Sequence, residues 1–416
     1  AQHVYRLMAQ IEGETVHDDV ISGLDYDAVN KVLADNVPAN ADVNIEKHRL
    51  GNVLLTGASG FLGLHVLMEL LKDSECYDKV YCLIRPTKRL NPEKRLKSIL
   101  FFFENQDFDE LIGNRVFAVG GDISKEEIFD EPNDIAFDTI INCAADVSHY
   151  AYGDKLDKAN TKSVNNLMKL AKRFGAELVQ VSTISVGGCY DTSKEKLTLP
   201  ENALYIGQEI HNQYALSKYM AEYNALKAMA DGVCNVKIMR VGNLQGRLSD
   251  GEFQIKKNTN AFTRQIVAYV RLGMVPESLY NSTVNFSPVD EVARMIVNLS
   301  MLPSNYTVFH VSPEEEVPFK MLFDAAVSLG YDVKVVSDQA FEEAIKELKK
   351  NKEIRSFLEA IFAERMDFKY SYSDISLDFT SDIIKKTGLK WGEIKKEYID
   401  TYMRVLDEFG VFGGDK

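Results

Sequence analysis

The sequence has no long hydrophobic run and no recognisable leader. No apolar stretch approaches the ~20 residues that span a bilayer, and no basic segment followed by an apolar one opens the chain. We therefore expect neither a membrane-spanning segment nor a membrane partner.

Cysteine is scarce. The chain has five, an odd number, and none of them stands in a Cys-x-x-Cys arrangement: Cys76, Cys82, Cys143, Cys189 and Cys234. This count and spacing exclude a disulfide framework and supply no zinc ligand set. We expect reduced thiols, a cytoplasmic protein and no metal site.

Basic charge is also in short supply. The chain has 48 Lys and Arg against 62 Asp and Glu, which leaves a net charge of −14 at pH 7. A nucleic-acid backbone needs a basic surface, so nonspecific nucleic-acid binding is disfavoured, and any anionic ligand must be held by a local basic cluster. The 416 residues, 45% of them hydrophobic, are enough for one large domain and a smaller one.

What the sequence does contain is an alternation of short apolar runs with helical patterns. Such alternation predicts a parallel sheet covered by helices on both faces, the doubly wound α/β arrangement of the Rossmann type. The runs predicted to be strands are residues 52–56, 80–84, 115–119, 139–142, 178–182 and 235–239. The stretches predicted to be helices are residues 64–71, 91–103, 160–174 and 213–229.

The domain organisation follows from this pattern. Residues 1–48 are a polar lead-in or linker with a helical signal at residues 26–33, and residues 49–300 form the nucleotide-binding domain, with a substrate-domain insertion around residues 247–285. Residues 301–416 are expected to form a smaller, mostly helical domain for substrate and carrier docking. The elements expected from residue 261 onward are helices at 261–272 and 289–299, a strand at 308–311, and helical regions at 341–364 and 379–412 around Trp391.

A glycine-rich turn over residues 56–63 joins the first predicted strand to its helix. Its glycines allow a tight turn, close approach of the backbone to a pyrophosphate, and close packing of the helix on the strand. The N–H groups at the helix start then face the phosphates, so the motif predicts dinucleotide binding. The expected cofactor contacts here are Thr56, Gly57, Ser59, Gly60, Phe61, Leu62 and Gly63.

A basic side chain stands at the end of the next predicted strand. NAD-binding proteins usually have an Asp or Glu there for the ribose hydroxyl, but this chain has Arg85, with Arg95 further on. A carboxylate would repel a 2′-phosphate, whereas a guanidinium can clamp it. We therefore expect NADPH rather than NADH, with Arg85 as the first candidate for the phosphate and Arg95 as the second. A solvated basic loop is the alternative.

Tyr214 and Lys218 stand at i and i+4, so they lie on one face of a predicted helix. A nearby ammonium favours the phenolate and should lower the pKa of the tyrosine from its usual value of about 10. The tyrosine can then exchange a proton with a carbonyl oxygen, while the lysine can bond the nicotinamide ribose.

Hydroxyl residues end the fifth predicted strand, where ligands bind in such folds. Thr183 is the candidate to hold the substrate oxygen beside the tyrosine, and Ser182 and Ser185 are alternates; capping of local backbone is the other interpretation. His149 and His211 lie near the same region, and each is interpreted as a packed or exposed side chain rather than a catalytic one. Further cofactor contacts are expected from Asp122 and Ile123 at the adenine and from Asn142, Ala144 and Ala145 along the channel.

Together these motifs resemble the extended short-chain dehydrogenase/reductase superfamily. Within it, the chain is most similar to the terminal thioester reductase domains of nonribosomal peptide synthetases, which are related to the reductase domains of carboxylic acid reductases. Segments that carry the resemblance are residues 50–63, 83–86, 121–123, 142–145, 181–186, Tyr214 with Lys218, 240–247 and 288–290. Ser59 and Val241 depart from the usual Thr and Pro of the family, away from the chemistry. The resemblance adds Asn243 as a cofactor contact.

The resemblance implies a function. A peptidyl or acyl thioester on the phosphopantetheine arm of a carrier protein would be reduced by NADPH, with Thr183, Tyr214 and Lys218 as catalytic residues, to release an aldehyde or, after a second round, an alcohol. It also implies a monomeric domain of a larger synthetase. The alternatives within the superfamily are a fatty acyl-CoA reductase and an NAD-dependent nucleotide-sugar epimerase or dehydratase. A non-catalytic NADPH-sensing module is disfavoured, because such modules often lose the Tyr/Lys pair.

Overall fold

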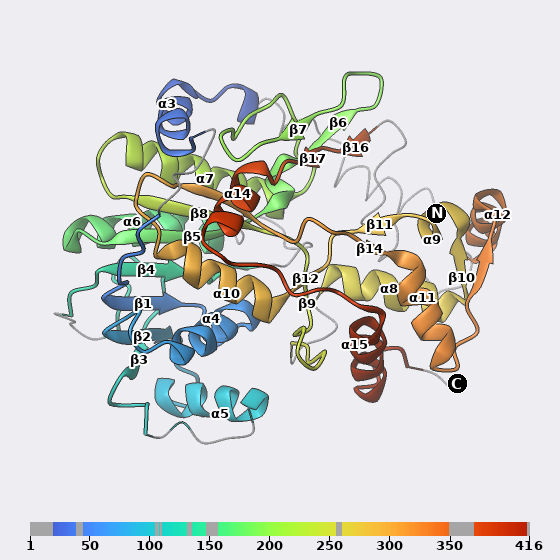
Figure 1. The fold of residues 1–416 in the computed structure, drawn as a ribbon, viewed down its shortest axis with the longest axis horizontal. Helices are drawn as coiled ribbons and strands as arrows, with labels where there is room; N and C mark the ends of the chain where they lie inside the picture. Colours follow the sequence, from blue (N-terminus) through green and yellow to red (C-terminus); the bar gives the residue numbers. More distant parts are fainter. Residues whose placement is uncertain are drawn as a thin grey trace.

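A seven-stranded parallel sheet forms the centre of the protein (Figure 1). In this computed structural model, the residues described are 20–38, 45–104, 108, 110–130, 135–146, 157–254, 260–348 and 370–413. The strand order is β13-β8-β5-β4-β1-β2-β3, which confirms the predicted doubly wound fold. The strands are β1 Asn52–Thr56, β2 Lys79–Ile84, β3 Val116–Gly120, β4 Thr139–Asn142, β5 Glu177–Thr183, β8 Val236–Val241 and β13 Val308–Val311.

Helices cover both faces of the sheet. The connection from β1 to β2 runs one way along the sheet and that from β4 to β5 runs the other way, so right-handed crossovers place their helices on opposite faces. Helix α4 packs with α10 on one face, and α6 packs with α7 on the other. The helices of this part are α3 Asp27–Asn36, α4 Phe61–Lys72, α5 Pro92–Glu104, α6 Ser163–Phe174, α7 Gln213–Ala230, α10 Val289–Ser300 and α14 Asp378–Lys386, with a π-helical turn, η1 Asp157–Lys162, before α6 and a 3-10 turn, η2 Ile184–Gly187, after β5.

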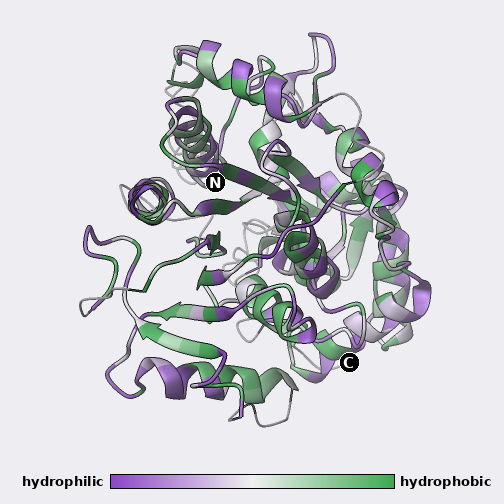
Figure 2. Cartoon of the chain, turned by 60° about the vertical axis from the view of Figure 1, so that its left-hand side comes forward, coloured by the Kyte–Doolittle hydropathy of each residue, from purple (hydrophilic) through white to green (hydrophobic). Residues whose placement is uncertain are grey.

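Most strand residues are apolar on both faces, and the two buried cations of β8, Lys237 and Arg240, pair with Glu177 and Glu222. In β4 and β8 every residue is buried, and the sheet appears as a hydrophobic layer between amphipathic helices (Figure 2). None of the described helices is both long and apolar enough to cross a membrane.

A second hydrophobic core lies at one end of the sheet (Figure 1). It is mostly helical, and aromatic side chains such as Phe262, Phe286, Phe323 and Tyr402 fill it. Its helices are α8 Ala261–Leu272, α9 Glu277–Tyr280, α11 Phe319–Ser328, α12 Asp338–Leu348 and α15 Lys396–Glu408. Short two-stranded pairs complete the fold: β9 Leu244–Gln245 with β12 Ser287–Pro288, β10 Met274–Pro276 with β15 Lys334–Val336, β11 Thr283–Val284 with β14 Val317–Pro318, β6 Cys189–Asp191 with β16 Tyr370–Tyr372, and β7 Thr198–Leu199 with β17 Asp374–Ile375. The last pair packs on the main core through Leu199 and Ile375.

The two cores interleave along the chain. Strand β13 lies beyond residue 300 yet pairs in parallel with β8, and α14 packs against it. The expected domain boundary at residue 300 therefore falls before the last strand of the sheet. The reason is that β13 is fully buried and, apart from His310, apolar, which suits a strand covered on both faces of the sheet.

The C-terminal helical regions are described in part. Helix α12 is described up to Leu348, and the rest of the predicted helical region up to residue 364 lies outside the described residues. The region around Trp391 is not one helix: α14 and α15 are separated by a connection that contains Trp391 and the positive-φ residue Gly388 (φ 72°). Glycine in this left-handed conformation is a common helix end, which explains the break.

The lead-in is docked on the main domain. The helical signal at residues 26–33 appears as α3, which packs on α7. The Tyr26 hydroxyl lies 2.6 Å from that of Tyr219 on α7, and its ring stacks on Tyr205 at 5.0 Å. This segment therefore braces the helix that carries Tyr214 and Lys218.

Candidate active site

The glycine turn lies where the strand order reverses, between β1 and β4. Gly57 has a φ of 74°, and a Cβ there would stand 2.6 Å from the Ala144 backbone nitrogen on the neighbouring strand connection. A Cβ on Gly63 would collide with the Gly57 carbonyl. Because glycine at the N-cap, Gly60, supplies no side-chain acceptor, the first N–H groups of α4 remain suited to a phosphate.

Two predicted cofactor contacts form the floor under this turn. The Thr56 hydroxyl donates to Asn142 Oδ1 at 2.5 Å, and Asn142 Nδ2 donates to Gln180 Oε1 at 2.7 Å. Both Thr56 and Asn142 are buried, so their side chains join β1, β4 and β5 and hold the turn in place. Ala144, whose N–H donates to Asn142 Oδ1 at 3.2 Å, and the exposed Ala145 border the turn instead.

Phe61 and Leu62 point away from the turn. The Phe61 ring packs against His65 at 5.1 Å and against Phe253 of the second core at 5.2 Å, and Leu62 is buried in the core of the main domain. These side chains fasten the start of α4, so any cofactor contact they make uses their backbone N–H groups.

A basic pair lies at the carboxyl ends of β2 and β3. Arg95 Nη1 donates to the Arg85 carbonyl at 2.7 Å, and burial together with the charge of Arg85 lowers the pKa of Arg95. Asp122 faces the same place: burial opposes its ionisation, but hydrogen bonds from Ser124 and the charge of Arg85 hold its pKa below the usual value. Next to it, the Ile123 carbonyl accepts a bond from Asn166 at 3.0 Å. The structure thus gathers Arg85, Arg95 and Asp122 at one end of the site.

The predicted catalytic residues meet at the carboxyl end of β5. Thr183 is the last residue of that strand, and its hydroxyl shares a hydrogen bond with the Tyr214 phenol on the first turn of α7. Asn212 caps this helix by accepting from the Ala215 N–H at 2.7 Å, which fixes the start of the turn. Lys218 is buried, and its Nζ donates to the Val181 carbonyl at 3.0 Å.

The titration of this group differs from the expectation. Burial raises the pKa of Tyr214 to about 12, although the hydrogen bond with Thr183 opposes the rise. Lys218 is not among the groups that shift the pKa of Tyr214, and its ammonium donates to the Val181 carbonyl. Burial lowers the pKa of Lys218 to about 8, opposed by Cys143 and Glu222.

The two neighbouring serines, Ser182 and Ser185, make different contacts. Thr183 Oγ1 lies 3.1 Å from Ser185 Oγ and accepts from the Ser185 N–H, so Ser185 orients the threonine. Ser182 is buried, and its hydroxyl has no hydrogen-bond partner among the described residues. Of the three candidates, Thr183 is the one bonded to Tyr214.

Asn160 is a site residue that the sequence interpretation missed. It lies in η1, and its buried side chain donates to Ser217 Oγ at 2.9 Å and accepts from the Asp146 N–H at 2.9 Å. It therefore ties the segment after β4 to the stretch of α7 between Tyr214 and Lys218. Only its position at the start of a predicted helix hinted at this, because an isolated asparagine carries no pattern.

Three other predicted residues are placed as follows. Asn243 follows β8, where its N–H donates to Asn285 Oδ1 at 2.8 Å and its carbonyl accepts from Ser287. His149 lies outside the described residues. His211 is not an isolated side chain, because it contacts Glu209 and Cys189.

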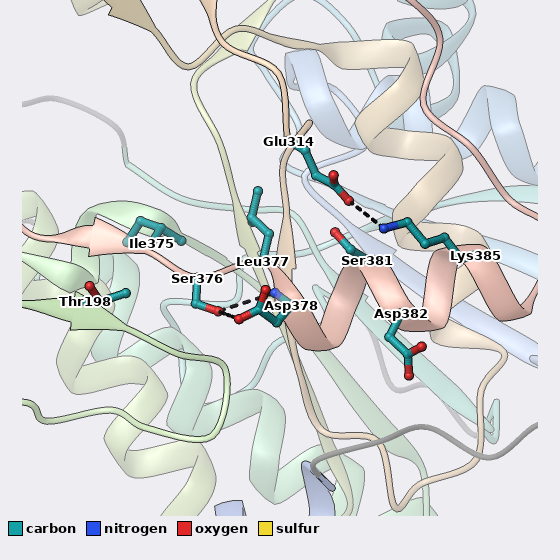
Figure 3. A pocket seen from close by; sticks show the side chains of 9 residues that line it. All are labelled: Thr198, Glu314, Ile375, Ser376, Leu377, Asp378, Ser381, Asp382 and Lys385. Carbon is teal, nitrogen blue, oxygen red and sulfur yellow. Dashed lines mark hydrogen bonds and ion pairs between the residues drawn. The ribbon is translucent and has the colours of Figure 1, made fainter.

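A separate surface hollow of about 550 Å³ lies beside the start of α14 (Figure 3). It contains no predicted site residue, and across its rim Lys385 pairs with Glu314 at 3.5 Å. Nor do the described residues contain a cluster of His, Cys, Asp and Glu side chains that could hold a metal.

Comparison with known proteins identifies the family to which this chain belongs. The family model described as Male sterility protein, an NAD-binding domain, matches residues 55–296, more than half of the chain. The L-2-aminoadipate reductase large subunit of Candida glabrata is 28% identical over 319 residues, which are 71% of this chain and 22% of that protein. The chain thus spans about a fifth of the length of this curated relative.

Solved structures agree over nearly the whole chain. A thiolation-reductase di-domain from an archaeal non-ribosomal peptide synthetase is 32% identical, with a TM-score of 0.86 over 98% of this chain and 85% of that one. The reductase domain of the aureusimine biosynthetic cluster has the same fold, with 23% identity and a TM-score of 0.77 over 95% of this chain and 99% of that one. The chain therefore belongs to the Male sterility protein family of NAD(P)-binding domains, and it is a reductase of the kind found in nonribosomal peptide synthetases.

Proposed function

We propose that this chain uses NADPH to reduce a peptidyl or acyl thioester, carried on the phosphopantetheine arm of a carrier protein, and releases an aldehyde. The observation that carries the proposal is the hydrogen-bonded pair of Thr183 and Tyr214, with Lys218 behind it, at the carboxyl end of β5. A pair of hydroxyls beside a dinucleotide turn suits reduction of a carbonyl group.

The basic pair supports NADPH over NADH. A 2′-phosphate carries about two negative charges, and Arg85 and Arg95 bring two guanidinium groups to the end of β2, where NAD-binding proteins usually have a carboxylate. Asp122, whose carboxylate accepts from the Ser124 N–H at 2.9 Å, is placed one strand further along and suits the adenine. When bound, NADPH would supply a hydride to the thioester carbon.

The residues of the chain have distinct parts in this reaction. Thr183 and Tyr214 donate hydrogen bonds to the carbonyl oxygen and stabilise the negative charge that develops on it. Because the pKa of Tyr214 is about 12, the phenol is protonated at neutral pH and can give its proton to that oxygen. Lys218 is suited to orient the nicotinamide ribose, and Asn160 and Asn212 hold the first turns of α7 in place.

The relatives support the carrier-bound substrate. The archaeal structure joins a thiolation domain to its reductase, and this chain aligns with 85% of that di-domain. A linear gramicidin synthase of Brevibacillus parabrevis, in which the match covers 7% of the protein, is likewise a large synthetase. We therefore propose that this chain works as the reductase part of such an assembly.

The test is to mix the purified chain with NADPH and an acyl-pantetheine thioester and to follow the nicotinamide absorbance. We expect oxidation of NADPH, formation of an aldehyde that a hydrazine reagent traps, and faster turnover of the carrier-bound thioester than of the acyl-CoA. No oxidation with either NADPH or NADH would overturn the proposal. Preference for acyl-CoA would instead assign a free thioester as the substrate.

A further inference from the structure

A histidine with two polar partners stands three residues before the catalytic tyrosine. His211 Nε2 is 3.1 Å from Glu209 Oε2, its Nδ1 is 3.6 Å from Cys189 Sγ, and its ring packs edge-on against Tyr370 at 4.5 Å. The side chain is 37% exposed, so it can exchange protons with water. Glu209 therefore holds one ring nitrogen, and histidine is a side chain that commonly transfers protons in catalysis.

Short chain connections limit the distance between the His211 cluster and the catalytic pair, Thr183 and Tyr214. His211 precedes Tyr214 by three residues, which limits the separation of their Cα atoms to about 11 Å. The Glu209 and Cys189 backbones bond to each other in both directions, and η2 links Cys189 to Thr183. The residues that follow Thr183 and those that precede Tyr214 are therefore joined at His211.

Thioester reduction takes up one proton overall, and a scheme in which Tyr214 serves only the carbonyl oxygen leaves the departing sulfur to be protonated by another group. A thioester, NADPH and one proton give an aldehyde, a thiol and NADP⁺. Tyr214 gives a proton to the oxygen of the tetrahedral intermediate and takes it back when the carbonyl re-forms. As the C–S bond breaks, its electron pair leaves on sulfur, and that thiolate needs a proton from another group.

We propose that His211 protonates the departing pantetheine thiolate, an inference that rests on the proposed function. Solvent then reprotonates His211, so this histidine supplies the one proton that the overall reaction consumes. Glu209 acts as a positioning residue that keeps the ring in place.

Other groups near the catalytic pair are poorly suited to this task. Lys218 is buried and bonded to the Val181 carbonyl, and burial raises the pKa of the Cys143 thiol to about 12. An imidazolium is a stronger acid than an alkyl thiol, so transfer of a proton from an imidazolium to a thiolate is downhill.

The experiment compares three substrates in His211→Gln and in the unchanged chain: an alkyl pantetheine thioester, an aryl thioester of the same acid, and the matching aldehyde. An aryl thiolate leaves without help and reduction of an aldehyde releases no thiol. We expect His211→Gln to slow the alkyl thioester about 100-fold and to leave the other two within about twofold. Binding of NADPH, followed by its fluorescence, should not change.

His48→Gln is the matched control. His48 Nε2 also lies near a glutamate, 4.0 Å from Glu177 Oε2, but at the opposite end of β5 from Thr183. The His48→Gln variant should turn over all three substrates at the rate of the unchanged chain. Equal slowing of both thioesters by His211→Gln, or no slowing of either, would overturn the inference. If the unchanged chain oxidised NADPH with neither thioester, the proposed function itself would fail.

Discussion

The two ends of the site are built in different ways. The cofactor end consists of consecutive residues, 56–63, whose geometry is set by backbone constraints, with Arg85 one strand away. The carbonyl end brings together Asn160, Thr183, Tyr214 and Lys218, which come from η1, β5 and α7. The comparison teaches that the glycine turn of the cofactor end depends on local sequence, whereas the carbonyl end depends on how distant segments pack.

The largest effect is expected at the carbonyl end. Tyr214→Phe removes the proton donor and the bond to Thr183, and should lower turnover by about 10²–10⁴-fold. Binding of NADPH, measured by fluorescence, should remain, because the cofactor end is untouched. Equal loss of binding would show that the two ends are not separable.

The second-largest effect is expected at the cofactor end. Arg85→Ala should weaken NADPH binding by about 1.5–3 kcal/mol, since hydrogen bonds to charged groups contribute that much, and should leave NADH binding unchanged. Titration of each cofactor measures the difference. Arg95→Ala offers a matched comparison, and an equal loss for both cofactors in the two variants would argue against a 2′-phosphate site.

The next prediction concerns the backbone of the glycine turn. Gly63→Ala places a methyl group against the Gly57 carbonyl and should destabilise the fold by about 1–3 kcal/mol in urea unfolding, with loss of cofactor affinity. At Gly60 the nearest atom to an added Cβ would be the Gly57 carbonyl oxygen, at 3.1 Å, so Gly60→Ala should cost less. The reverse order would contradict the account of the turn.

The smallest effect concerns the outer face of α7. Tyr26→Phe keeps the stacking on Tyr205 but removes the hydrogen bonds with Tyr219 and with the Ile21 carbonyl, and should lower the free energy of unfolding by about 1–2 kcal/mol. Turnover by the folded variant should be unchanged. A drop in turnover would mean that the lead-in tunes the catalytic helix rather than only bracing it.

The sequence predicted the fold and the local motifs well for physical reasons. The bounds of β1 were predicted from an apolar run that stops at a glycine, and Tyr214 and Lys218 were predicted from helical spacing; the structure places both on α7. These signals are short-range, so they survive without knowledge of the tertiary structure.

The rest depends on packing between distant residues. Asn160 and Ser217 are 57 positions apart, and the contacts of His211 with Cys189 and Tyr370 join three separate segments. The raised pKa of Tyr214 follows from burial, which helical spacing does not reveal. For the same reason, the place of β13 in the sheet could not be assigned to the main domain from its sequence.

The most direct test of the central claim is the fate of the hydride. The chain is given a carrier-bound acyl thioester and NADPH that carries deuterium at its transferable position, and the released product is examined by mass spectrometry. The account predicts an aldehyde with deuterium on its carbonyl carbon, formed by the unchanged chain about 10²–10⁴-fold faster than by Tyr214→Phe. An unlabelled product, or formation of the labelled product by Tyr214→Phe at the unchanged rate, would contradict it.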